Sequence, residues 1–87
     1  MSNKGDKKMI SAYILIDMKP GDTDKPIAEM RKLKNVEKIS VVAGEYDIVV
    51  RVRVSSLDLL LKVTNKIQMI KGVNKTTTQV IEKEIAV

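Results

Sequence analysis

The sequence predicts an α+β domain in which a four-stranded antiparallel sheet carries two helices on one face. Four segments are rich in β-branched residues or alternate between apolar and polar positions, which is typical of strands. Two other segments repeat apolar residues at helical spacing. The six segments follow one another in the order βαββαβ. Right-handed crossovers then give the ferredoxin-like arrangement.

The first strand is expected over residues 9–17, and its inward face consists of Ile10, Ala12, Ile14 and Ile16. A loop at residues 19–22 follows, because it contains Pro and Gly. The first helix is expected over residues 23–34. Pro26 fits its first turn, where a backbone N–H is not needed. The apolar stripe of this helix is Ile27, Met30 and Leu33.

The two middle strands are expected over residues 36–43 and 46–54, as a hairpin. Gly44, Glu45, Tyr46 and Asp47 make its turn, where Asn-Gly or Asp-Gly would be ordinary.

The second helix is expected to begin at Ser55-Ser56, with Ser55 and Asp58 spaced as in a capping box. Its buried face is Leu60, Val63, Ile67 and Ile70, and Gly72 is a common helix stop. The last strand is expected over residues 73–87, with Val80 and Ile81 at its centre.

The chain has 87 residues and a net charge of +5, which fits one small domain. Residues 1–8 are expected to be a flexible basic tail, and residues 9–87 the folded domain. A core of this size is marginal alone, so association would add stability.

The composition argues against most catalytic and nucleic-acid functions. Without Cys and His there is no disulfide, thiol nucleophile or imidazole base, and no metal site, cofactor or enzyme activity is predicted. Tyr13 and Tyr46 are the only aromatic residues, which is too few for a base-stacking platform. No membrane helix or signal peptide is seen, so a cytoplasmic location is expected.

Polar chemistry gathers in two places. In the hairpin turn, Asp47 can accept from an ammonium group, backbone amides near Gly44 can donate to a carboxylate, and Tyr46 can close a pocket. In the last strand, the hydroxyls of Thr76 and Thr78 share one face by the period of two. Each residue also has a structural interpretation: a positive φ for glycine, an acceptor of turn amides for aspartate, an interface anchor for tyrosine and good strand formers for the threonines.

The sheet face that the helices leave uncovered is expected to be an interface. Tyr13 and Leu15 lie on it in the first strand, and Val49 lies on it beside Arg51 and Arg53. Val41 and Val42 make the strand expected at the centre apolar on both faces. Apolar residues on neighbouring strands usually mark an interface, so we expect a dimer with its sheets packed face to face. The arginines are expected to be solvated or ion-paired.

The segment VVAGEYDIVVRVRV, followed by an amphipathic helix and then IKGVNKTTTQVI, resembles the effector-binding domain of the Lrp/AsnC family, also called the RAM domain. The most specific parts are the G-x-[YF]-D turn at residues 44–47 and the G-V-x-x-T-x-T segment at residues 72–78. The resemblance covers residues 9–85, nearly the whole chain.

This resemblance implies a non-catalytic domain that binds a free amino acid and takes part in regulating transcription of amino-acid metabolism. Family members are dimers that assemble into tetramers or octamers, with the effector between dimers. Carried onto this sequence, the ligand-binding residues are Gly44, Tyr46, Asp47, Thr76 and Thr78. About eight residues precede the first strand, where family regulators carry a helix-turn-helix domain. A stand-alone form is therefore expected, without direct DNA binding and with a full-length regulator of the same family as a partner.

Four other interpretations stay open or are set aside. An ACT-type regulatory module shares the element order and would bind its amino acid near residues 19–24, with Gly21 in the loop. An oligomeric scaffold without a ligand is also compatible with the sequence. An acylphosphatase would need an Arg in the loop after the first strand, which Lys19-Pro20-Gly21-Asp22 does not supply. A dimeric αβ-barrel monooxygenase usually relies on His or aromatic pocket residues, which are missing.

Overall fold

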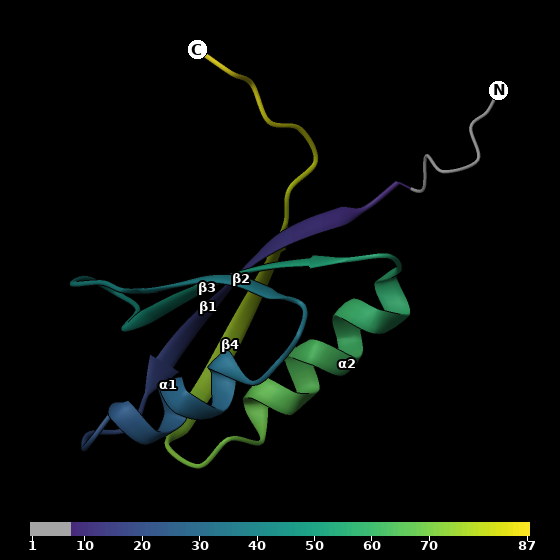
Figure 1. The fold of residues 1–87 in the computed structure, drawn as a ribbon. Coiled ribbons are helices and arrows are strands. Elements are labelled where there is room, and N and C mark those ends of the chain that lie inside the picture. Colours follow the sequence, from purple (N-terminus) through teal and green to yellow (C-terminus); the bar gives the residue numbers. More distant parts are fainter. Residues whose placement is uncertain (1–7) are drawn as a thin grey trace, which may run out of the picture.

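The computed structural model describes residues 8–87, so the tail expected at residues 1–8 lies outside the described residues except for Lys8. Six elements follow one another in the predicted order (Figure 1): β1 (Ile10–Met18), α1 (Asp24–Arg31), β2 (Val36–Val41), β3 (Ile48–Val54), α2 (Leu57–Gln68) and β4 (Val73–Val80). All neighbouring strands in the sheet are antiparallel, and their order is β2-β3-β1-β4. The predicted fold class is confirmed.

Both helices lie on the same face of the sheet (Figure 1). Alternation explains this, since every second residue of β1 and β3 points to the helices and is apolar. The buried core is Ala12, Ile14, Ile16, Met30, Ile48, Val50, Val52, Val54, Leu60, Val63, Ile67 and Val73. The face expected to be inward in β1 is therefore confirmed, with Ile10 only partly buried.

Helix α1 is shorter than expected and ends at Arg31 rather than near residue 34. Its C-terminal end tightens into i→i−3 hydrogen bonds, from Lys32 N to Glu29 O and from Leu33 N to Met30 O. This tightening turns the chain into β2 within a few residues. Leu33 still packs against the core, although it lies beyond the helix.

The cap of α2 is Ser56, so the expected capping box from Ser55 is wrong. Ser56 has an extended backbone, and its hydroxyl accepts from Leu59 N at 3.1 Å. The helix ends at Gln68, before the expected stop at Gly72. Gly72 has a φ of +102°, and a Cβ there would lie 3.2 Å from Pro26 Cγ, so this glycine also permits close packing against α1.

Strand β4 ends at Val80, so the expected strand to residue 87 is wrong, and Val80 lies at its end instead of its centre. The reason is the length of its partner. Ala12 pairs with Val80, and Ile81 N donates to Ser11 O at 2.9 Å. Because β1 begins at Ile10, little strand remains for residues 82–87 to pair with.

Strand β2 lies at the edge of the sheet, which corrects its expected central place. It ends at Val41, which is 68% exposed, so Val41 and Val42 do not form the apolar centre of the sheet. The register of β2 shifts between Val36 and Lys38, which is a β-bulge opposite β3. The bulge brings both Glu37 and Lys38 to the level of Arg51.

Candidate functional site

The predicted ligand-binding turn forms a loop of residues 42–47 at the end of the β2–β3 hairpin. Its base is closed by a hydrogen bond from Val42 N to Asp47 O at 2.9 Å. Gly44 has a φ of +153°, which L side chains rarely adopt, so the glycine is needed for the turn. A Cβ at Gly44 would meet no heavy atom within 4 Å, so the space beside the turn is open.

Asp47 anchors this loop to β1 through both its backbone and its side chain. Its N–H donates to Ile16 O at 2.9 Å, and its Oδ2 accepts from Met18 N at 2.8 Å. The amide that donates to Asp47 Oδ2 belongs to β1 and not to the turn, so the expected acceptance of turn amides is replaced by a contact between the loop and β1. A carboxylate has acceptor capacity for about four hydrogen bonds, so the bond to Met18 leaves room for an ammonium group. Tyr46 precedes it and is partly buried.

The two predicted threonines lie in β4 on the helix-covered face. Thr76 pairs with Ile16 and Thr78 pairs with Ile14, which confirms that they share a face. Thr76 Oγ1 lies 3.0 Å from Gln68 Oε1 and donates to it, so this hydroxyl links β4 to α2. Thr78 lines a shallow hollow beside α2, together with Leu57, Leu61 and Thr64.

The turn and the threonines approach β1 from opposite sides. Asp47 contacts β1 from the β3 side, and Thr76 pairs with it from the β4 side. Both reach the level of Ile16, but β1 lies between them, and two strand spacings separate β3 from β4 by roughly 10 Å. The structure therefore places these predicted residues at one end of the sheet without bringing them together.

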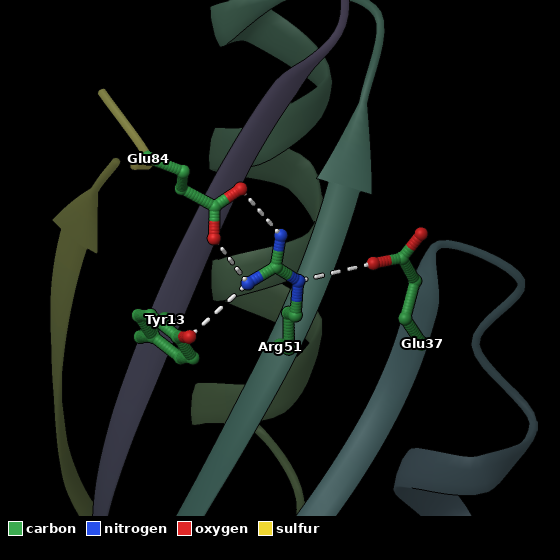
Figure 2. A network of polar contacts seen from close by, with 4 residues as sticks. All are labelled: Tyr13, Glu37, Arg51 and Glu84. Atoms are coloured by element: carbon green, nitrogen blue, oxygen red, sulfur yellow. Dashed lines mark hydrogen bonds and ion pairs between the residues drawn. The ribbon is translucent and has the colours of Figure 1, made fainter. Parts of the chain in front are cut away.

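The opposite, open face of the sheet carries an ion-pair network around Arg51 (Figure 2). Two nitrogens of Arg51, Nη1 and Nη2, each donate to one oxygen of Glu84 at 3.1 Å. Nη1 also donates to the Tyr13 hydroxyl at 3.1 Å, and Nε donates to Glu37 Oε1 at 3.3 Å. The guanidinium carbon lies 5.5 Å from the centroid of the Tyr13 ring. Of the two expected states, solvated or ion-paired, Arg51 adopts the ion-paired one.

This network shifts the pKa values of Arg51 and Glu84. Hydrogen bonds from Arg51, followed by its charge, lower the pKa of Glu84. The bond to Glu84 and then the bond to Tyr13 raise the pKa of Arg51. The bidentate pair is therefore ionised over a wider pH range than either group would be alone.

Sequence reasoning did not find Glu84 and Glu37 as the partners of Arg51. Glu84 is 33 positions away from Arg51 along the chain, so no local spacing indicates the pair. Glu37 reaches Arg51 through the bulge in β2, which changes the register by one residue. The only available signal was the pair of arginines alternating out of the core.

The loop after β1 also forms a hollow. Its lining includes Lys19, Gly21 and Asp22 from the loop, with Lys71 and Gly72 from the segment before β4. Lys19 N donates to Gly72 O at 2.8 Å and holds the two segments together. Among residues 8–87, no group of three or more acidic residues is arranged to hold a metal ion, and no helix is long and apolar enough to cross a membrane.

Residues 11–86 match the family model described as the Lrp/AsnC ligand binding domain. The chain belongs to the Lrp/AsnC family. The chain is 38% identical over 74 residues to a Pyrococcus furiosus protein, the uncharacterized HTH-type transcriptional regulator PF0250. That match covers 80% of this chain and 49% of the relative, so the chain spans about half the length of this regulator.

Two solved structures show the same fold at moderate identity. The feast or famine regulatory protein Rv3291c from Mycobacterium tuberculosis, complexed with L-methionine, is 28% identical with a TM-score of 0.77. The match covers 90% of this chain and 53% of that one. TTHA0845 from Thermus thermophilus is 26% identical with a TM-score of 0.82, and the match covers 90% of this chain and 99% of that one.

Proposed function

We propose that this protein is a non-catalytic sensor that binds a free amino acid at the turn of residues 44–47. The observation that carries the proposal is the geometry of this turn, with open space at Gly44 and an anchored carboxylate at Asp47. Gly44 leaves open space beside its backbone, while Asp47 is fixed to β1 and keeps acceptor capacity. A positioned carboxylate beside an accessible backbone offers an acceptor for the ammonium group and donors for the carboxylate of a zwitterionic ligand.

Each part of an amino acid has a partner of suitable chemistry here. The ammonium group would donate to Asp47, and backbone N–H groups beside Gly44 would donate to the carboxylate. Tyr46 would cover the ligand with its ring. Rv3291c, a solved relative, holds L-methionine, so an apolar amino acid is the first ligand to test.

Thr76 and Thr78 would complete the site from a neighbouring chain. Within one chain, β1 lies between the threonines and the turn. A single ligand therefore does not contact both the turn and the threonines of the same chain. An effector at a contact between dimers would meet the turn of one dimer and the threonine strand of another. Binding would then favour the assembled state, because a ligand shared by two dimers stabilises their contact.

The dimer itself is proposed to form through the open faces of two sheets. Leu15 and Val49 pair directly across β1 and β3 on this face and are only partly buried. Tyr13, in the same strand as Leu15, is 38% exposed. Such dimers, assembled to tetramers or octamers, would act as a stand-alone module or together with a full-length regulator of the family. The nearly complete coverage of TTHA0845 supports a module of this length.

Thermal unfolding against a panel of free amino acids, methionine included, tests the proposed function. A ligand at 100 times its Kd should add about 2.7 kcal/mol to the free energy of unfolding. For a domain of this size that is a shift in Tm of several degrees. The shift should vanish in Asp47→Asn, in which the amide oxygen still accepts from Met18 N but the charge is gone. No shift with any amino acid would favour a scaffold without a ligand.

A second candidate site is the hollow at the β1–α1 loop, where an ACT-type module would bind. The observation that favours it is the concave lining, which combines Lys19, Lys71 and Asp22. The panel separates the two sites if Asp22→Asn is included. If the ligand-induced shift in Tm is lost in Asp22→Asn and kept in Asp47→Asn, the ligand binds at this loop and not at the turn of residues 44–47.

A further inference from the structure

The chain beyond β4 carries apolar side chains that stay exposed in the part of the chain the structure describes, residues 8–87. We name residues 82–87 the arm. Ile85 in the arm is 73% exposed, and Val87 is also exposed. Figure 1 shows the arm leaving the end of β4 and extending beyond the sheet, away from both helices. Exposed apolar residues at the end of an extended segment are suited to packing against another molecule.

The arm is nevertheless tied to a defined place on the open face. Figure 2 shows the Glu84 side chain passing in front of β1 to reach Arg51 in β3. The contact is bidentate, with both oxygens of Glu84 at 3.1 Å from guanidinium nitrogens. This geometry is specific as well as attractive, because two parallel hydrogen bonds fix the orientation of both groups. The arm therefore brings a carboxylate to the middle of the proposed dimer interface.

The charge of the open face makes this carboxylate important for assembly. By strand alternation, the face carries four cationic side chains and two acidic ones, namely Lys38, Arg51, Arg53, Lys75, Asp17 and Glu37. Two copies packed face to face would bring these net positive surfaces together, which is unfavourable. The arm adds Glu82 and Glu84 against Lys83 and so supplies negative charge where the two faces meet.

We propose that the arms are exchanged in the dimer, with Glu84 of each chain paired to Arg51 of the other. The proposal rests on the dimer of the proposed function. Packed sheets lie about 10 Å apart, so an arm that stays over its own β1 would lie in the gap between the sheets. An arm that crosses to the second copy gives up the pair with its own Arg51 and forms the equivalent pair with Arg51 of that copy, so the number of ion pairs is unchanged. Its apolar residues Ile85 and Val87 then gain a surface to pack against.

Charge-reversed variants distinguish exchange from pairing within one chain. Arg51→Glu leaves two acidic groups, and Glu84→Arg leaves two cationic groups, so each variant alone should dimerise at least about tenfold more weakly than the wild type. When the two variants are mixed, exchanged arms restore both pairs in the heterodimer. Native mass spectrometry should then show heterodimer well above the statistical half. Circular dichroism of each variant checks that the fold is intact.

A matched mixture controls for general attraction between oppositely altered chains. Arg53→Glu and Glu82→Arg carry the same charge changes at neighbouring positions on the same face and arm, outside the Arg51–Glu84 pair. Their mixture should give much less heterodimer enrichment. Equal enrichment in both mixtures, or none with Arg51→Glu and Glu84→Arg, would overturn the exchange. A monomeric wild type would instead refute the dimer of the proposed function.

Discussion

The two faces of the sheet differ in how completely one chain buries their apolar side chains. On the helix-covered face, Ile14, Ile16 and Val50 are fully buried beneath α1 and α2. On the open face, Leu15 and Val49 remain partly exposed, and the polar groups gather around Arg51. Adjacent residues in the same strand thus differ in burial, because successive side chains point to opposite faces of the sheet.

One chain therefore buries the apolar residues on the helix-covered face and leaves those on the open face partly exposed. Helices cover only one face of an antiparallel sheet, and the other face is ordinarily polar when it contacts water. Here it combines apolar side chains with an ion-pair network held by a segment from outside the sheet. We infer that the helix-covered face determines folding and that the open face determines assembly.

The largest effect that tests this difference is expected from Ile14→Ala. Removing a fully buried isoleucine from the core should lower the free energy of unfolding by about 2–5 kcal/mol. Leu15→Ala is the matched variant, one residue along on the open face, and should cost much less in dilute, dissociated protein. Urea unfolding of both variants at low concentration makes the comparison. Equal losses would mean that the open face is part of the protomer core.

Asp47 should show a smaller effect on stability that depends on the substituent. Asp47→Ala leaves Met18 N without its acceptor and should cost about 1–3 kcal/mol of unfolding free energy. Asp47→Asn keeps an acceptor oxygen, so its loss of unfolding free energy should be much smaller. It should still abolish the shift in Tm that a bound amino acid causes. Urea unfolding measures both variants. If Asp47→Ala were as stable as Asp47→Asn, the bond to Met18 would contribute nothing to the fold.

Substitutions at the start of α2 test how much the N-terminal cap stabilises this helix. Ser56→Ala removes the oxygen that accepts from Leu59 N and should cost about 1 kcal/mol. Ser55→Ala changes the neighbouring hydroxyl, which is not the cap, and should be close to neutral. Thermal unfolding of the two variants side by side measures the difference. If Ser55→Ala lowered the Tm more than Ser56→Ala, the capping box predicted from the sequence would be correct.

The smallest effect concerns the ionisation of Glu84 on the open face. Because pairing lowers its folded pKa, the stabilisation is present above the unfolded pKa and is lost as pH falls through the folded pKa. A pH titration of the Glu84 carboxyl carbon by NMR should show a midpoint below that of an ordinary glutamate. In Arg51→Gln the midpoint should rise toward the ordinary value. An unchanged midpoint would show that Arg51 does not hold this carboxylate in solution.

Much of the fold could be predicted because the relevant signals are local. The alternation in β1 and β3 and the apolar spacing of Leu60, Val63 and Ile67 determine which faces are buried, and those predictions are confirmed. Element ends were less predictable, since the end of β4 depends on the length of β1, its partner strand. The edge position of β2 likewise depends on which strand pairs with β3, and no local pattern reports that.

The residues of the candidate site are a prediction from the sequence, whereas their arrangement comes from the structure. The turn motif and the threonine strand identify Asp47 and Thr76 from the sequence. That β1 separates them, and that Thr76 bonds to Gln68, follows only from the packed sheet and helix. The Arg51–Glu84 pair joins residues far apart in the chain, so only the folded structure reveals it.

The most direct test of the account is sedimentation equilibrium of the wild type and of Val49→Asp, with Val41→Asp as control. Val49 lies on the open face beside Leu15, whereas Val41 is exposed at the edge strand β2. We expect a dimer or a multiple of it for the wild type and for Val41→Asp, and a folded monomer for Val49→Asp. A wild type with the mass of one chain at every concentration, or a Val49→Asp variant that assembles like the wild type, would contradict it.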